Sequence, residues 1–241
     1  PVAEKGNPTV PRELTEQEIE KLADDYARAA RRAQHAGYDA LEIHGAHGYL
    51  IHQFLSTAAN KRTDQYGGSL QNRMRFAELV VRKIRAAVGA RFAVLFRMSA
   101  EGGYAIDEAV QIARALEACG VDAIHVSVGG NTPISLIPPD ASPMARPEGW
   151  LTGHAAMIKQ RVAVPVIVVG EIRHAHFAED VLAQGKADFI ALARPFLADP
   201  DWPAKARAGR DDEIRHCISC DYCRLALMFT RPIRCLVNPE L

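Results

Sequence analysis

Four cysteines near the end of the sequence form its clearest chemical pattern. They are spaced as Cys217-x2-Cys220-x2-Cys223-x11-Cys235. Structural zinc sites usually combine two separated Cys-x2-Cys pairs, whereas three cysteines at this close spacing are typical of 4Fe-4S clusters. We therefore predict that the four thiolates bind a 4Fe-4S cluster, with zinc as the alternative. The fifth cysteine, Cys119, lies in an apolar helical stretch and is expected to be a buried small side chain.

A second group of chemical side chains follows the first predicted strand. His44, His47 and Tyr49 lie within one short segment, separated by Gly and Ala. Ligands bind beyond the carboxyl ends of the strands in parallel α/β sheets. Two imidazoles and a phenol at such a place can hold a carbonyl oxygen and protonate a carbon next to it. The structural alternative is a pair of helix-capping histidines and a core tyrosine.

Arg97 is a charged residue inside the otherwise apolar strand predicted at Phe92–Met98. A buried guanidinium is costly unless an anion meets it. Two anions are candidates: the carboxylate of Glu42 on the neighbouring strand, or the anionic part of a cofactor bound at the end of the strand.

A phosphate site is predicted at the ends of the last two strands. Gly170 follows the strand at Pro165–Val169, and Ala193 and Arg194 end the strand that begins at Phe189. Glycine lets the backbone approach a phosphate, and arginine can bind it with two hydrogen bonds. Barrel enzymes commonly hold phosphate in these two loops. Turn geometry alone would also explain Gly170.

Alternating strands and helices position these residues. A capping box at Thr15–Glu18 begins a helix that ends near Ala36, and Ser69 is a plausible N-cap for a helix from about Gln71 to Val88. The remaining predicted elements are helices at 107–119, 152–161 and 175–184, strands at 40–44, 92–98, 123–128, 165–169 and 189–193, and loops at 1–12, 60–68 and 131–149. Apolar strands separated by amphipathic helices indicate βαβ units and a parallel sheet.

The number of strands conflicts with the length. The chain has 241 residues, close to the roughly 250 of one (β/α)8 barrel, which needs three more strands than the five predicted here. Either a small open doubly wound sheet or the back part of a barrel fits five strands. A first residue other than Met, and a last segment Asn238–Leu241 that does not look like a natural end, favour a fragment.

The composition excludes several classes of protein. Lys+Arg and Asp+Glu both number 29, so the formal net charge is +0 and no long-range field attracts nucleic acid or a membrane surface. No apolar run approaches the roughly 18 residues that span a bilayer, and no signal peptide is recognisable. Clustered rather than dispersed cysteines indicate a reduced metal centre. We expect a cytoplasmic protein with small-molecule partners, and its assembly into a homo-oligomer stays open.

Several motifs together resemble one family. The segments at 44–56 (HGAHGYLIHQFLS) and 60–69 (NKRTDQYGGS), Arg97, and the run at 193–200 (ARPFLADP) resemble the Old Yellow Enzyme flavoprotein family. The cysteine pattern, with Asn238 and Pro239, resembles the iron–sulfur branch that includes 2,4-dienoyl-CoA reductase and trimethylamine dehydrogenase. The similarity covers nearly the whole chain.

The resemblance implies an α/β fold: an FMN-binding (β/α)8 TIM barrel at residues 1–210, present only as strands four to eight, followed by a 4Fe-4S-binding segment at 211–241. By family role, His44 and His47 hold the substrate carbonyl over FMN, and Tyr49 is the proton donor.

The resemblance also assigns the cofactor contacts. Arg97 faces the N1/O2 edge of the flavin, and the phosphate site takes Gly170, Ala193 and Arg194. The cluster passes single electrons to FMN from an FAD that NAD(P)H reduces, and the domains for FAD and NAD(P)H are expected beyond this chain.

The histidine pair indicates the substrate class. Tyr49 is shared with dienoyl-CoA reductases, but His44 and His47 together are more like the pair of ordinary enone reductases. We predict NAD(P)H-driven reduction of the C=C bond of an enone, enoate or dienoyl-CoA. Oxidative N-demethylation of an amine, as in trimethylamine dehydrogenase, is the first alternative. The second is that the chain alone is an inactive fragment that only binds metal.

Overall fold

A single five-stranded parallel sheet forms the centre of the chain. The computed structural model describes residues 10–129, 144 and 146–241. Its strands are β1 (Ala40–Gly45), β2 (Ala93–Ser99), β3 (Ala123–Ser127), β4 (Val166–Val168) and β5 (Phe189–Ile190), and they lie side by side in chain order. All five predicted strands are confirmed, with β4 and β5 shorter than expected. Most of the loops predicted at 1–12 and 131–149 lies outside the described residues.

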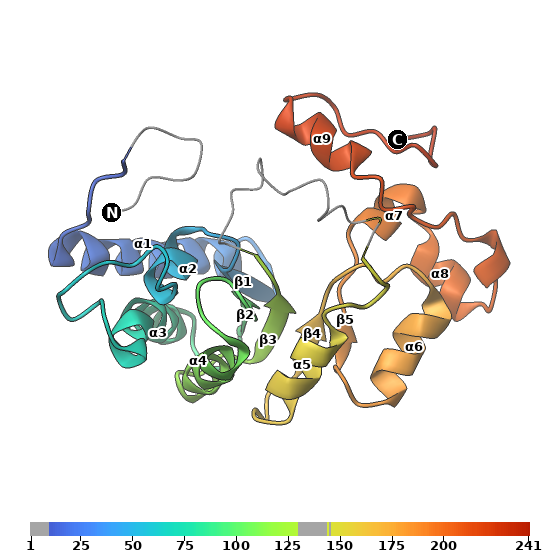
Figure 1. Ribbon diagram of the computed structural model, residues 1–241. Helices are drawn as coiled ribbons and strands as arrows, with labels where there is room; N and C mark the ends of the chain where they lie inside the picture. The colour runs from blue at the N-terminus through green and yellow to red at the C-terminus, as the bar shows by residue number, and fades with distance from the viewer. Residues whose placement is uncertain (1–9, 130–143, 145) are drawn as a thin grey trace.

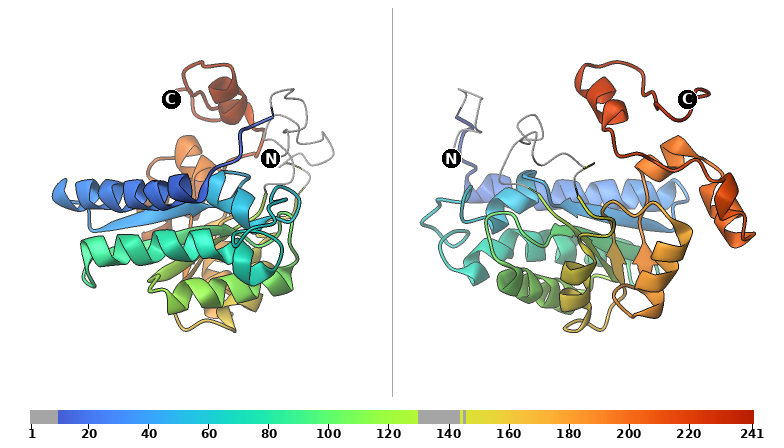
Figure 2. Two further views of the ribbon diagram at one scale, coloured as in Figure 1. Left: turned by 90° about the vertical axis from the view of Figure 1, so that its left-hand side faces the viewer. Right: turned by 45° about the vertical axis from the view of Figure 1, so that its right-hand side comes forward.

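Five longer helices pack along the outer side of this sheet, as Figure 1 and the left view of Figure 2 show. They are α1 (Glu16–His35), α3 (Leu70–Val88), α4 (Ile106–Ala118), α5 (Thr152–Lys159) and α6 (Ala175–Ala183). The capping box at Thr15 is present, and the Ser69 hydroxyl accepts a hydrogen bond from the Asn72 amide. Both predicted helix starts are therefore confirmed. Cys119 follows α4 in the core, and burial raises the pKa of its thiol.

The shortest helices were not predicted from the sequence. These are α2 (Leu50–Leu55), α7 (Arg194–Ala198), α8 (Trp202–Arg207), a 3-10 turn at Asp211–Glu213 and α9 (Tyr222–Met228). The four α-helices among them have five to seven residues. So few residues show too little of the 3.6-residue period to stand out.

The strand register divides the sheet into an apolar face and a charged face. Ile43, Phe96 and Ile124 are level with one another on β1, β2 and β3, and all three are buried in the core. Successive side chains of a strand point to opposite faces. The next residues along, which the register also makes level, are therefore on the inner face: His44, Arg97 and His125.

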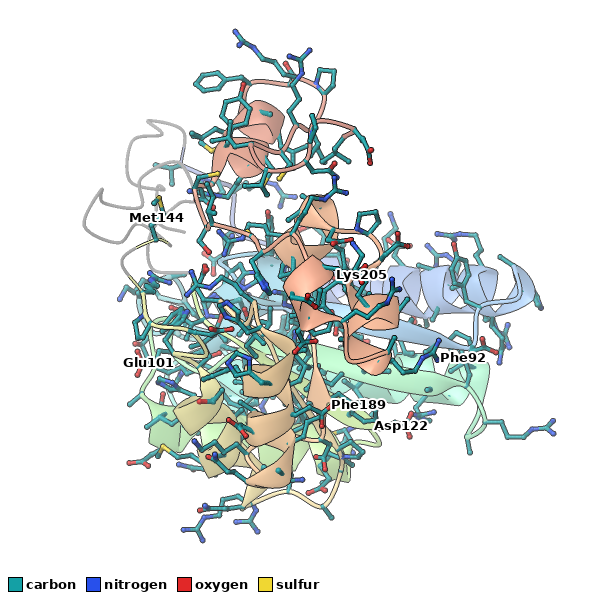
Figure 3. The ribbon with its side chains drawn as sticks, turned by 90° about the vertical axis from the view of Figure 1, so that its right-hand side faces the viewer. Phe92, Glu101, Asp122, Met144, Phe189 and Lys205 are labelled. Atoms are coloured by element: carbon teal, nitrogen blue, oxygen red, sulfur yellow. The ribbon has the colours of Figure 1, made fainter. Side chains whose placement is uncertain are left out.

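The strands all run toward the same end of the molecule. In Figure 3, Phe92 and Asp122, which precede β2 and β3, lie on the opposite side from Glu101, which follows β2. The segment that carries α9 lies beyond α7, on the side away from α5 and α6 (Figures 1 and 2). Within the described ranges, no helix is long and apolar enough to cross a membrane.

Candidate active site

His44, His47 and Tyr49 gather in one cluster at the carboxyl end of β1. The ring centroid of His44 is 5.0 Å from that of His47 and 5.0 Å from that of Tyr49. Tyr49 is 52% exposed, and α2 begins without a side-chain cap. Tyr49 occupies the N-cap position of α2 without making a side-chain cap bond, and its exposure shows that the alternative of a core tyrosine is wrong.

A left-handed turn presents the second histidine and the tyrosine. His47 has φ 61° and Gly48 has φ 80°, a region that residues other than glycine rarely adopt. The backbone N–H of His47 donates to Ser99 Oγ (3.3 Å), and the N–H of Gly48 donates to Nδ1 of the fully buried His52 (2.9 Å). These two bonds stabilise the strained turn. The sequence pattern did not indicate this role for His52.

Electrostatics keeps both site histidines neutral. Burial lowers the pKa of His44, and the positive charge of Arg97 adds to the effect. The same two causes, in the same order, lower the pKa of His47 to about 4. Near pH 7 each imidazole therefore carries one N–H and no charge. Nε2 of His47 lies 2.7 Å from Ser127 Oγ, which fixes the direction of its ring.

Among the residues that the structure describes, no carboxylate is bonded to Arg97. Glu42 instead holds His125 (Oε1 to Nδ1, 2.7 Å), so the predicted alternative of a Glu42–Arg97 ion pair is wrong. Nε of Arg97 is buried without a hydrogen-bond partner among the described residues, and Nη2 makes one long bond to Ser127 Oγ (3.5 Å). Burial lowers the pKa of Arg97, although the charge of Glu42 opposes the shift. An anion that contacted this guanidinium would satisfy it.

The predicted phosphate residues lie together, but Arg194 already has partners. Gly170, with φ 136°, follows β4, and Ala193 immediately precedes α7. Arg194 Nη1 donates to Asp221 Oδ1 (2.9 Å), and Nη2 donates to Glu171 Oε1. No sequence pattern indicated either carboxylate.

One large pocket joins most of the predicted residues. Its volume is about 750 Å³, within the range of small-molecule and cofactor sites. The predicted residues that line it are His47, Arg97, Gly170, Ala193, Arg194, Cys217 and Cys223. His44 and Tyr49 are not among its lining residues and stand beside His47. The pocket therefore runs from the histidine cluster, past the phosphate residues, to the cysteines.

The four C-terminal cysteines surround a smaller pocket next to Arg194. All are free thiols, and Cys217 Sγ accepts a hydrogen bond from the Ser219 N–H (3.4 Å). In the part of the chain that the structure describes, no three metal-binding side chains converge on a single ion. The 4Fe-4S cluster, in which each thiolate binds a different iron, and its zinc alternative both stay predictions.

Two polar residues that the sequence analysis passed over share a recognisable signal. His125 and Ser127 are buried inside the apolar strand β3, just as Arg97 stands inside β2. A polar side chain in an apolar strand that neighbours a predicted site could have identified both. Glu171 and Asp221 have no such signal, because only the folded chain brings them to Arg194.

The chain belongs to the NADH:flavin oxidoreductase / NADH oxidase family, whose model matches residues 1–213. The resemblance to Old Yellow Enzymes is thereby confirmed, and membership implies FMN as a cofactor. Among curated proteins, an NADH oxidase from Thermoanaerobacter brockii is 46% identical over 237 residues, which are 96% of this chain and 36% of that protein.

Solved structures of two enzymes are also similar to this chain. A 2-naphthoyl-CoA reductase in complex with 2-naphthoyl-CoA matches with TM-score 0.89 and 31% identity, over 95% of this chain and 35% of that one. A histamine dehydrogenase from Rhizobium sp. 4-9 matches with TM-score 0.83 and 35% identity, over 97% and 34%. The chain spans about a third of the length of these relatives. The five parallel strands are part of the family's TIM barrel, as predicted.

Proposed function

We propose that the protein containing this chain uses FMN, a 4Fe-4S cluster and electrons from NAD(P)H to reduce a C=C bond conjugated to a carbonyl. The cluster of His44, His47 and Tyr49 carries the proposal: two neutral imidazoles lie beside an exposed phenol. Neutral N–H groups can bind the substrate carbonyl oxygen and polarise it, and the Tyr49 hydroxyl can give a proton to the adjacent carbon. Similarity to a 2-naphthoyl-CoA reductase, which carries an unsaturated acyl thioester, supports this substrate class.

The chain offers residues that fit FMN. When bound, FMN supplies a hydride to the substrate carbon. Arg97, whose Nε has no hydrogen-bond partner in the described part of the chain, would contact the edge of the flavin that gains negative charge. Each Nη of Arg194 has a second N–H besides the one given to Asp221 or Glu171, so Arg194 would hold the phosphate together with Gly170 and Ala193. The pocket that these residues line ends near His47, so it would bring the substrate cluster and the flavin contacts together.

The cysteines would supply the path for electrons. The four C-terminal cysteines would hold a cluster that supplies one-electron transfer. The Ser219 N–H bond to Cys217 Sγ is of the kind that tunes the potential of such clusters. FAD and the NAD(P)H site would lie in parts of the protein outside this chain.

Tyr49→Phe tests the proton donor in the longest form that the gene encodes. We expect C=C reduction of enones, enoates and dienoyl-CoA to fall by about 10²- to 10⁴-fold, while flavin content and flavin reduction by NAD(P)H stay unchanged. Tyr38→Phe is the matched control, because Tyr38 is also exposed (67%) and precedes β1 at its opposite end. Full turnover in Tyr49→Phe with flavin bound would show that the proton comes from elsewhere.

Oxidation of an amine is the second candidate, favoured by the similarity to a histamine dehydrogenase. Amine cations are usually bound by aromatic rings. The end of β1 offers two imidazoles and only one such ring, the phenol of Tyr49, and this composition places amine oxidation second. Anaerobic addition of methylated amines or histamine without NAD(P)H decides the order. Flavin bleaching by an amine, with no turnover of enones, would reverse it.

A further inference from the structure

Glu171 joins three segments of the chain with one carboxylate. It lies in the loop after β4, beside Gly170, and its side chain is only 6% exposed. Oε1 accepts a hydrogen bond from Arg194 at the start of α7, and Oε2 accepts one from the hydroxyl of Ser219. Ser219 stands between the first two cysteines of the C-terminal pattern. A residue of the barrel loop is thereby bonded directly to the loop at 217–223, which we call the cysteine loop.

Arg194 extends this connection to a second point of the cysteine loop. Its Nη1 donates to Asp221 Oδ1, and Asp221 Oδ2 accepts from Arg224 Nε (2.7 Å). The guanidinium is thus held between the two carboxylates of Glu171 and Asp221. Burial alone would lower the pKa of Arg194, but the hydrogen bond and charge of Glu171 and the charge of Asp221 raise it overall. Arg194 stays charged, and both of its bonds are charge-assisted.

The backbone at these contacts is held in an unfavourable conformation. Glu171 (φ 54°), Ser219 (φ 54°) and Asp221 (φ 60°) are all non-glycine residues in the left-handed region. Such conformations persist only where surrounding contacts enforce them. Here the three residues are linked to each other through the same hydrogen bonds. Losing the carboxylate of Glu171 would remove two of those bonds together.

Ser219 connects Glu171 to the thiol of Cys217. It is 1% exposed, its hydroxyl is bonded to Glu171, and its N–H is bonded to Cys217 Sγ. The other end of the segment has its own attachment, from the Asn238 side-chain amide to the Leu197 carbonyl (3.0 Å). The contact through Glu171 therefore fixes the cysteine loop, and the contact through Asn238 fixes the part near Cys235.

We propose that Glu171 is a positioning residue that holds the cysteine loop at a fixed place against the loop that follows β4. The proposed effect of Glu171 on the positions of the cysteines rests on contacts within this chain. Its proposed effect on the iron content rests on the function proposed above. If Glu171 were only the ion-pair partner of Arg194, its removal would leave the cysteine loop unchanged. The effect of removing Glu171 on the cysteine loop therefore tests the proposal.

The test uses the full-length protein and four variants. Glu171→Ala removes both bonds, Glu171→Gln keeps the shape but loses the charge, and Ser219→Ala cuts only the bond to the cysteine loop. Glu179→Ala is the matched control, because Glu179 is exposed on the nearby helix α6. Trypsin cleavage within residues 210–234, measured by mass spectrometry, reports the attachment of the loop. Iron and flavin are measured per chain on the same samples.

We expect Glu171→Ala and Ser219→Ala to raise the cleavage rate by roughly tenfold or more, the change that loss of a hydrogen bond to a charged group produces. Glu171→Gln should fall between them and the wild type. Iron per chain should drop in the same order while flavin stays bound, which also shows that the barrel is folded. Wild-type cleavage in Ser219→Ala and Glu171→Gln would overturn the proposal. A wild-type protein without iron would refute the cluster, and the cleavage rates would still decide the role of Glu171.

Discussion

The buried histidine of α2 gives a sharp prediction about stability and pH. His52 has no exposed surface, and its Nδ1 accepts the N–H of Gly48 in the turn that presents His47 and Tyr49. Burial lowers its pKa from 6.5 to about 4, and the charge of His44 adds to this, although the backbone of Gly102 opposes it. A proton on Nδ1 of His52 would remove the lone pair that accepts the Gly48 N–H.

The size of the effect follows from the pKa shift. The unfolded chain binds a proton on this side chain near pH 6.5, whereas the folded chain binds it only near pH 4. The stabilisation is therefore complete above pH 6.5 and is lost as the pH falls from 6.5 to 4. At 1.36 kcal/mol per unit, the loss from His52 alone is about 3 kcal/mol.

His52→Asn isolates this contribution, because the Asn Oδ1 occupies the place of Nδ1 and accepts the same N–H without titrating. The assay is urea unfolding, followed by circular dichroism, from about pH 7 down to about pH 4. We expect the wild type to lose about 3 kcal/mol more than the variant over this range. His35→Asn, at an exposed position at the end of α1, should behave like the wild type. Equal slopes in the wild type and His52→Asn would refute the reasoning.

Two further predictions concern the loop and helix that follow α2. A Cβ added at Gly67 would lie 2.0 Å from the Arg62 carbonyl oxygen, so Gly67→Ala should lower the free energy of unfolding by about 2 to 3 kcal/mol. Gly153→Ala is the control, because a Cβ added there meets nothing within 4 Å. Equal stability of the two variants would contradict the prediction. Ser69→Ala removes the hydroxyl that accepts the Asn72 N–H and should cost about 1 kcal/mol in the same unfolding assay. No loss in Ser69→Ala would mean that water replaces the cap fully.

Local patterns sufficed for the main elements of the fold. The capping box at Thr15 and the cap at Ser69 marked two helix starts, because capping depends on residues three positions apart. Largely apolar runs marked the five strands, because other elements cover both faces of a parallel sheet. The short helices α2 and α7 escaped, since five or six residues cannot show a period of 3.6.

The sequence by itself also determined which residue types stand at the ends of the strands, and family membership followed from those motifs. What it could not give is the pairing of side chains from distant segments. Glu42 was one of two candidate partners for Arg97 but meets His125 instead, and Arg194 is bonded to Glu171 and Asp221, two carboxylates that lie far from it in the sequence.

Those pairings depend on strand register and on where the C-terminal segment packs. The register sets His44, Arg97 and His125 level on one face, which no local pattern specifies. Burial of that layer then lowers the pKa values of His44 and Arg97, because desolvation disfavours the charged form and depends on every neighbouring segment. The sequence therefore determined the chemical groups of this protein, and only the tertiary structure decided their partners and their charge.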